Sequence, residues 1–319
     1  MRTPLFGMLT TVLFCCACAH PGTTIPIDDS YTVSQRYYAY HEEYPDLRLP
    51  TVEFGAGQKV AFDRRYKTIN ERELHMDVFV PSAQMAKRRG IVLVHGGAWR
   101  SGNKSHFYTL ANLLSQRGYT VFLPEYRLAP EAQYPAGLVD INDAILWVKE
   151  HATDFEIDPN QLALGGGSSG GQMAALIAYA SDKDTFKSNP NDDTHVSALI
   201  DLDGVLDFMT PVALEHENAA GSHSPAALWL GGEMEKATDR WKAASAASYV
   251  NDHSPPTLII SSGQARFTAG KEEVLPALED YGIRAAYFEF SNVPHTFWLF
   301  DPYVNKVADL VDTFLTDAE

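Results

Sequence analysis

Two serines stand among glycines at residues 166–171, Gly-Gly-Ser-Ser-Gly-Gly. The stretch follows the short apolar run 162–164 and precedes an alanine-rich segment, an order that indicates a strand, a sharp turn and a helix. Such a turn needs glycines on both sides, because the strand and the helix approach each other closely. It exposes one hydroxyl beside the free N–H groups of a helix N-terminus. We therefore predict Ser168 as a nucleophile, with Ser169 as its rival. The stretch lacks the Gly-Lys-Ser/Thr ending of a P-loop, which disfavours phosphate binding.

A second glycine-containing loop, His-Gly-Gly-Ala-Trp at residues 95–99, follows the apolar run 91–94. Attack by a serine on an acyl carbon creates an oxyanion that needs N–H donors, and glycines let backbone N–H groups approach it closely. We expect Gly96 and Gly97 to supply such donors, together with the N–H of Ser169. His95 is expected to brace this loop. An ordinary glycine turn is the simpler alternative for the loop alone.

A serine hydroxyl needs a base within hydrogen-bond reach before it can act as a nucleophile. Among 11 histidines, His295 alone follows a predicted strand near the C-terminus and stands beside aromatic residues at 297, 298 and 300. This position fits the chain order serine, acid, histidine. We predict His295 as the general base and expect Trp99 and Trp298 to contact substrate.

These residues need a scaffold, and the sequence alternates short apolar runs with stretches of helical spacing. Such alternation predicts a mostly parallel sheet of about eight strands with helices on both faces. Residues 208–248 are too long for a single crossover and are interpreted as a small cap insertion, or else as a longer ordinary crossover. Predicted strands span residues 60–69, 73–80, 91–94, 120–123, 162–164, 198–202, 257–261 and 285–290, with a turn at 70–72.

The first 19 residues resemble an export signal, with Arg2 followed by the apolar run 5–14. Cleavage before His20 competes with lipidation of Cys18, and either would make the protein periplasmic, secreted or lipid-anchored in bacteria. Residues 20–58 are polar and tyrosine-rich. They are expected to form a surface arm, or alternatively a flap over the substrate. Residues 59–319 form the predicted main domain.

The composition excludes some functions. The chain has 319 residues, is 45% hydrophobic and carries a net charge of −16, so it can bury a large core but repels nucleic acid and anionic lipid. All 3 cysteines precede residue 19, which leaves no thiolate for a disulfide or a zinc site in the remaining chain.

The motifs together resemble a known family. The loop 95–99, the stretch 125–131 and the serine turn 166–171 look like bacterial hormone-sensitive-lipase-like carboxylesterases, and residues 294–300 look closer to acetylxylan-esterase-like relatives. The resemblance covers about residues 60–315. It implies the α/β-hydrolase fold, a serine–acid–histidine triad without a cofactor, and hydrolysis of short-chain acyl or acetyl esters. The implied substrates are small-molecule or saccharide esters.

The acid of the triad departs from the family pattern. An aspartate is expected three residues after Gly263, but Arg266 stands there. Acetylxylan-esterase-like relatives carry a run similar to residues 266–272, which favours Glu272, whereas Glu273 and Asp203 stay as alternatives. Both glutamates also fit the first turn of a helix, where acidic residues are common. The remaining charged residues of interest are expected to be structural, namely Arg127, Glu131, Asp140 and Asp207.

Other functions compete with an esterase. The His-Gly-Gly-x-Trp loop also occurs in arylformamidases, so an amidase-type hydrolase is the nearest alternative. Arginine in place of the expected aspartate motivates a second alternative, a catalytically inactive binding module on the same fold. Nucleotide binding is a third alternative, which has only glycine spacing in its favour.

Overall fold

The computed structural model describes residues 30–317 of the chain, and the predicted export signal with Cys18 lies outside the described residues. One sheet of eight strands forms the centre of the molecule, in the order β1-β2-β4-β3-β5-β6-β7-β8. The pairs β1–β2 and β2–β4 are antiparallel and all the others are parallel, which confirms the predicted fold class. The strands are β1 Lys59–Ile69, β2 Arg72–Val80, β3 Arg89–Val94, β4 Tyr119–Pro124, β5 Leu162–Gly167, β6 Ala198–Leu202, β7 Thr257–Ser261 and β8 Ala285–Glu289.

The first hairpin is tighter than the sequence predicted. Ile69 pairs with Arg72, so Asn70 and Glu71 alone form the loop and Arg72 already belongs to β2. Asn70 has φ 55°, a left-handed conformation that asparagine tolerates well and that two-residue hairpin loops require.

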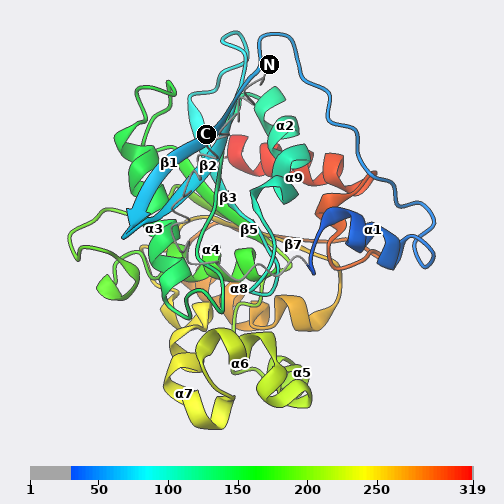
Figure 1. The fold of residues 1–319 in the computed structure, drawn as a ribbon, viewed down its shortest axis with the longest axis vertical. Coiled ribbons are helices and arrows are strands. Elements are labelled where there is room, and N and C mark those ends of the chain that lie inside the picture. The colour runs from blue at the N-terminus through cyan, green and yellow to red at the C-terminus, as the bar shows by residue number, and fades with distance from the viewer. Residues whose placement is uncertain (1–29, 318–319) are drawn as a thin grey trace, which may run out of the picture.

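Helices cover both faces of the sheet (Figure 1). Strands β3 to β7 are mostly apolar and almost entirely buried, as expected for parallel strands covered on two sides. One hydrophobic cluster joins the sheet to α3, α4 and α8, and the other joins it to α2 and α9. These helices are α2 Tyr108–Gln116, α3 Ala136–Glu150, α4 Ser169–Tyr179, α8 Lys271–Asp280 and α9 Tyr303–Thr316.

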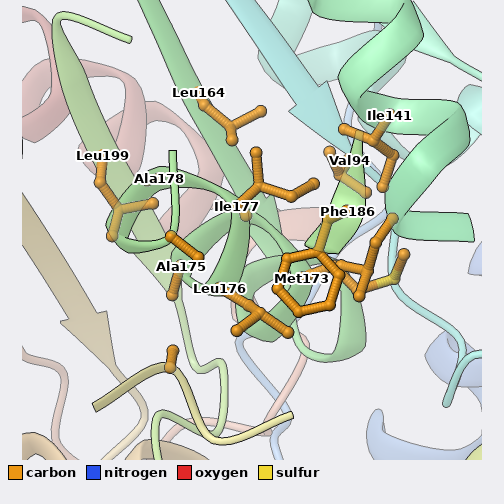
Figure 2. Close-up of a cluster of buried hydrophobic side chains, with 14 of the residues drawn as sticks. Val94, Ile141, Leu164, Met173, Ala175, Leu176, Ile177, Ala178, Phe186 and Leu199 are labelled. Atoms are coloured by element: carbon orange, nitrogen blue, oxygen red, sulfur yellow. The ribbon is translucent and has the colours of Figure 1, made fainter. Parts of the chain in front are cut away.

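Helix α4 is buried on every side, which explains its alanine-rich composition. Figure 2 shows Met173, Leu176 and Ile177 of α4 among side chains of the strands β3, β5 and β6. Small residues let the helix lie close to the sheet, and this close packing fixes the position of the turn between β5 and α4.

The described part of the N-terminal arm lies against the cluster formed with α2 and α9. It contains α1, Val33–Tyr40, whose Tyr37 ring lies 6.3 Å from that of Phe300. Leu47 is buried, and Arg48 forms an isolated β-bridge with Asp301. The arm is therefore attached near the loop that carries His295.

Three α-helices lie between β6 and β7, in the region predicted as an insertion. They are α5 Pro211–Ala220, α6 Pro225–Leu230 and α7 Met234–Ala243, and Figure 1 shows them together at the lower end of the molecule. No helix within residues 30–317 has the length and apolar composition needed to cross a membrane.

Candidate active site

The turn between β5 and α4 holds Ser168 in a strained conformation. Its φ of 55° and ψ of −124° lie outside the regions that residues with a side chain normally occupy. The N–H of Ser168 donates to Leu202 O at 2.8 Å, which ties the turn to β6. A Cβ on Gly166 would lie 2.3 Å from Gly170 O, and one on Gly170 would lie 2.1 Å from Val94 O. Glycine is therefore required on both sides of the serine by close backbone approach.

The structure brings Ser168 and His295 together. Ser168 Oγ lies 2.8 Å from His295 Nε2, and His295 Nδ1 lies 2.9 Å from Asp203 Oδ2. A carboxylate can only accept, so Nδ1 donates to Asp203 and leaves Nε2 free to accept the Ser168 hydroxyl hydrogen. Ser169 has no such contact and its side chain is buried, which favours Ser168 over its rival.

Asp203 is the carboxylate that contacts His295, the role that was predicted for Glu272. It follows β6 directly, is fully buried, and has φ 53°. Its second oxygen, Oδ1, accepts the N–H of Ser262 at 2.8 Å, so loops after two neighbouring strands fix this carboxylate. Asp203 was only one of the alternatives in the sequence, because nothing local distinguishes it from the other acids.

The expectation that Glu272 is the acid partner of His295 is corrected by these contacts. Glu272 lies in the first turn of α8, its side chain is 66% exposed, and its ion pair is with Lys271. Glu273 lies in the same turn and is also exposed. Both residues serve the helix N-terminus, where negative charge interacts favourably with the helix dipole.

The pKa of His295 is lowered by burial and, to a smaller extent, by the nearby charge of Arg266. The hydrogen bond and the negative charge of Asp203 oppose this shift. The imidazole is therefore held neutral near pH 7, which is the form that can accept a proton. The ring also stacks on Phe267, with centroids 3.3 Å apart and an interplanar angle of 8°.

The loop after β3 lies against the serine turn. A Cβ on Gly96 would lie 2.5 Å from Gly167 O and 3.1 Å from Ser168 Cβ, so this close approach requires glycine. Gly97 has φ +133°, and its carbonyl accepts the N–H of Ser101. Ala98 lines the cavity beside Ser168 and Ser169 and was not predicted as a site residue. Its position directly after the two glycines of the loop could have indicated that it lies in the site.

His95 braces this loop, as expected. Its ring stacks on Tyr126 at 4.5 Å, and the Tyr126 hydroxyl donates to His95 O at 2.7 Å. Burial lowers the pKa of His95 to about 3, so the ring stays neutral.

Of the two tryptophans predicted to contact substrate, only Trp99 lines the cavity. It donates from Nε1 to Gln172 Oε1 at 2.9 Å and stacks on Trp229. Trp298 is buried, does not contribute to the cavity wall and packs edge-on against His295 with centroids 5.5 Å apart. A Cβ on Gly167 would lie 2.6 Å from its ring. The expectation that Trp298 contacts substrate is therefore corrected: it supports the serine and histidine loops from behind.

A cavity of about 120 Å³ opens at Ser168. One part of its wall is apolar, and the other part is polar, with Arg266, His216 and Glu217. Most of the wall was not identified from the sequence, because it comes from the insertion and from the loop after β7. The residues lining it are Ala98, Trp99, Ser168, Ser169, Gln172, Asp203, Val205, Phe208, Ala213, His216, Glu217, Pro225, Arg266 and Phe267.

Other charged residues singled out in the sequence form structural contacts and do not line the cavity. Arg127 donates from Nε to Asp140 Oδ2 at 2.8 Å, and Glu131 accepts from Arg72 Nε at 3.1 Å. Asp207 Oδ1 accepts the N–H of Met209 at 2.7 Å. Within residues 30–317 no group of three or more acidic, histidine or cysteine residues is arranged to hold a metal ion.

A mostly parallel sheet with a strained serine after β5, an acid after β6 and a histidine after β8 defines the chain as an α/β-hydrolase. Within that class, the family model BD-FAE matches residues 76–267, more than half of the chain. The chain therefore belongs to the BD-FAE family.

The relatives with similar sequences include named esterases. Esterase LipQ of Mycobacterium tuberculosis is 28% identical over 257 residues, which cover 76% of this chain and 59% of LipQ. Carboxylesterase NlhH of the same organism is 36% identical over 89 residues, which cover 28% of each chain. The chain thus spans only about three fifths of LipQ.

Solved structures share the fold. A truncated carbohydrate esterase from gut microbiota has a TM-score of 0.69 at 20% identity, covering 84% of this chain and 100% of its own. Esterase Est2 of Thermogutta terrifontis has a TM-score of 0.64 at 22% identity, covering 82% and 93%. At these identities the similarity concerns the fold.

Proposed function

We propose that this protein is a serine esterase that removes short acyl groups, above all acetyl groups, from saccharide esters. The observation that carries the proposal is the triad of Ser168, His295 and Asp203, joined by contacts of 2.8 and 2.9 Å at the mouth of a cavity.

In the proposed reaction, His295 Nε2 takes the hydroxyl proton as Ser168 Oγ attacks the ester carbonyl carbon. Asp203 holds the imidazole in the correct tautomer and stabilises its positive charge. The N–H of Ser169, at the N-terminus of α4, and N–H groups of the loop carrying Gly96 and Gly97 stabilise the oxyanion. His295 then gives its proton to the departing alcohol, and water releases the acid from Ser168 by the same steps.

The size of the cavity supports a short acyl group. Its volume of about 120 Å³ is somewhat smaller than the roughly 150 Å³ known to accommodate benzene in an apolar cavity. An acetyl or propionyl group fits this space, whereas an octanoyl chain would have to extend into solvent.

The saccharide part of the proposal draws on the resemblance of residues 294–300 to acetylxylan-esterase-like proteins. Two of the matching structures are named as a carbohydrate esterase from gut microbiota and a bifunctional GH43-CE of Bacteroides eggerthii. The polar side of the cavity wall also suits an alcohol rich in hydroxyl groups.

The proposal is tested with the purified protein and a fluorophosphonate probe. We expect hydrolysis of 4-nitrophenyl acetate with a higher kcat/KM than for the octanoate, and covalent labelling that is lost in Ser168→Ala. Ser169→Ala keeps its backbone N–H and is expected to remain labelled. A folded protein that hydrolyses neither ester would refute the esterase. Activity confined to formamide or peptide substrates would assign an amidase instead.

We also propose that the protein is exported, on the basis of the N-terminal sequence alone. Expression of the full chain in a bacterial host and mass spectrometry of the mature N-terminus test this. A chain beginning at His20 indicates signal cleavage, and a diacylglyceryl group on Cys18 indicates a lipid anchor. An intact N-terminus in the cytoplasmic fraction would rule out export.

A further inference from the structure

Arg266 supplies the cationic part of the cavity wall. It lies in the short 3-10 helix Ala265–Thr268, in the loop after β7. Its Nη1 lies 2.8 Å from Nδ1 and 2.6 Å from Nε2 of His216, and donates to whichever ring nitrogen is unprotonated. Its remaining N–H donors, on Nε and Nη2, make no hydrogen bond within residues 30–317. Part of the planar guanidinium fork is therefore available to a ligand.

No carboxylate among residues 30–317 lies within 4.0 Å of this guanidinium. Glu217 lines the same cavity, but its carboxylate accepts from the Ser224 hydroxyl. Both oxygens of Asp203 accept hydrogen bonds, from His295 and from Ser262. An arginine without a carboxylate partner is unexpected in a chain with 41 acidic residues against 25 basic ones. The carboxylates of Glu217 and Asp203 lend negative charge at longer range, but neither forms an ion pair with the guanidinium. A carboxylate on the substrate would supply the direct partner.

The place of Arg266 relative to His295 indicates which part of the substrate it meets. The imidazole stacks on one face of the Phe267 ring, at 3.3 Å between centroids. The Arg266 guanidinium carbon lies 4.1 Å from the centroid of the same ring, and it occupies the other face because the imidazole fills the first. In a serine hydrolase the histidine delivers its proton to the leaving alcohol. An alcohol that departs at His295 and extends past Phe267 along the cavity wall would therefore reach Arg266.

We propose that Arg266 recognises a carboxylate carried by the alcohol part of the ester, as in an acylated uronic acid unit of a saccharide. This inference rests on the proposed esterase function and names its substrate class. The arginine fork binds a carboxylate through two parallel hydrogen bonds, which fixes the orientation of the alcohol as well as its affinity. The apolar part of the wall, with Trp99 and Phe208, is then left to the acyl group.

The test compares esters that differ in one charge. The substrates are 3- and 4-acetoxybenzoate, and the methyl esters of both, in which the carboxylate is neutralised. For each isomer kcat/KM is measured for the charged and the neutral compound, and their ratio is divided by the same ratio for alkaline hydrolysis without enzyme. We expect the corrected ratio to exceed one by about tenfold for at least one isomer, the effect of one charge-assisted hydrogen bond. The preference should weaken as ionic strength rises.

Three variants locate the effect. Arg266→Gln should lower the corrected ratio by about tenfold, and Arg266→Lys, which keeps the charge without the fork, should lower it less. Arg64→Gln removes the same charge from an exposed position on β1, outside the cavity, and should leave the ratio unchanged. A ratio near one for both isomers, or equal ratios in the wild type and Arg266→Gln, would overturn the proposal although the esterase stands. Failure to hydrolyse even the neutral esters would overturn the esterase itself.

Discussion

At the scale of single residues, the feature with the most consequences is the buried carboxylate of Asp203. It accepts from His295 Nδ1 at 2.9 Å and from the Ser262 N–H at 2.8 Å, and it has no exposed surface. In this setting an aspartate fixes the imidazole tautomer and offsets the charge that the ring gains when it takes the Ser168 proton. A neutral amide of the same shape can do neither.

The first prediction concerns this carboxylate. Asp203→Asn is expected to lower kcat for 4-nitrophenyl acetate by about 10⁴-fold, the order typical for loss of a triad carboxylate. Glu272→Gln, which removes an exposed acid from α8, is the matched control and should retain the wild-type rate. Circular dichroism checks that both variants are folded. Loss of activity in the Glu272 variant alone would return the catalytic acid to α8.

The second prediction concerns the pH dependence of the reaction. Burial lowers the pKa of His295 below its ordinary value of about 6.5, and only the neutral ring accepts a proton. Activity is therefore present above the lowered pKa and lost as the pH falls through it. The acid limb of kcat/KM should have its midpoint below pH ~6.5. A midpoint clearly above that value would show that the charge of Asp203 outweighs the effect of burial.

At the scale of elements, the turn between β5 and α4 depends on how closely helix and strands approach. Gly170 lies against the end of β3, where an added Cβ would meet Val94 O at 2.1 Å and His95 O at 2.5 Å. Both atoms belong to the backbone and cannot rotate away. This contact sets the distance between the serine turn and the oxyanion loop.

The third prediction tests that contact. Gly170→Ala is expected to lower the free energy of unfolding by at least about 2 kcal/mol, because overpacking forces the backbone apart. Gly232→Ala provides a control, since its new Cβ would lie 3.4 Å from Ala237 Cβ, an ordinary van der Waals distance. Urea titration monitored by tryptophan fluorescence measures both. Equal stability of the two variants would mean that α4 shifts without cost.

The sequence predicted the site residues that lie in local motifs, and it did not predict those that only tertiary packing selects. Ser168 and His295 stand in local motifs whose spacing reflects a strand end, so their types and order were informative. The acid carries no local signature: Asp203 and Glu272 both follow strands, and only tertiary packing selects between them. Trp298 was misassigned for a related reason, since periodicity does not distinguish an aromatic residue in a cavity from one behind it.

At the scale of the whole molecule, ion pairs connect segments that are far apart in the chain. Although the net charge is −16, some of the cations form partly buried pairs with acidic residues. Lys67 of β1 lies 2.6 Å from Asp140 of α3, and Arg127, which precedes α3, lies 2.8 Å from the same carboxylate. Asp140 is completely buried, so these two cations are its counter-ions in a region of low dielectric.

The fourth prediction concerns this cluster. Asp140→Ala leaves the partly buried Arg127 without its carboxylate partner, whereas Lys67 keeps Asp143 at 2.5 Å, and it should cost about 3 kcal/mol of unfolding free energy. Glu73→Ala removes the partner of Arg65 at the surface, where the side chains are 62% and 44% exposed, and should cost under about 1 kcal/mol. Denaturant unfolding of both variants at equal ionic strength provides the comparison. A small loss in Asp140→Ala would mean that solvent reaches the Arg127 guanidinium.

The triad is assembled from segments far apart in the chain, because Ser168 and Asp203 precede the helices α5 to α7 whereas His295 follows β8. A nascent polypeptide that has not yet emerged past β8 thus displays a nucleophile without a base. Hydrolytic competence appears only once the segment that carries His295 has emerged and folded, so the onset of activity during translation would report when β8 joins the sheet.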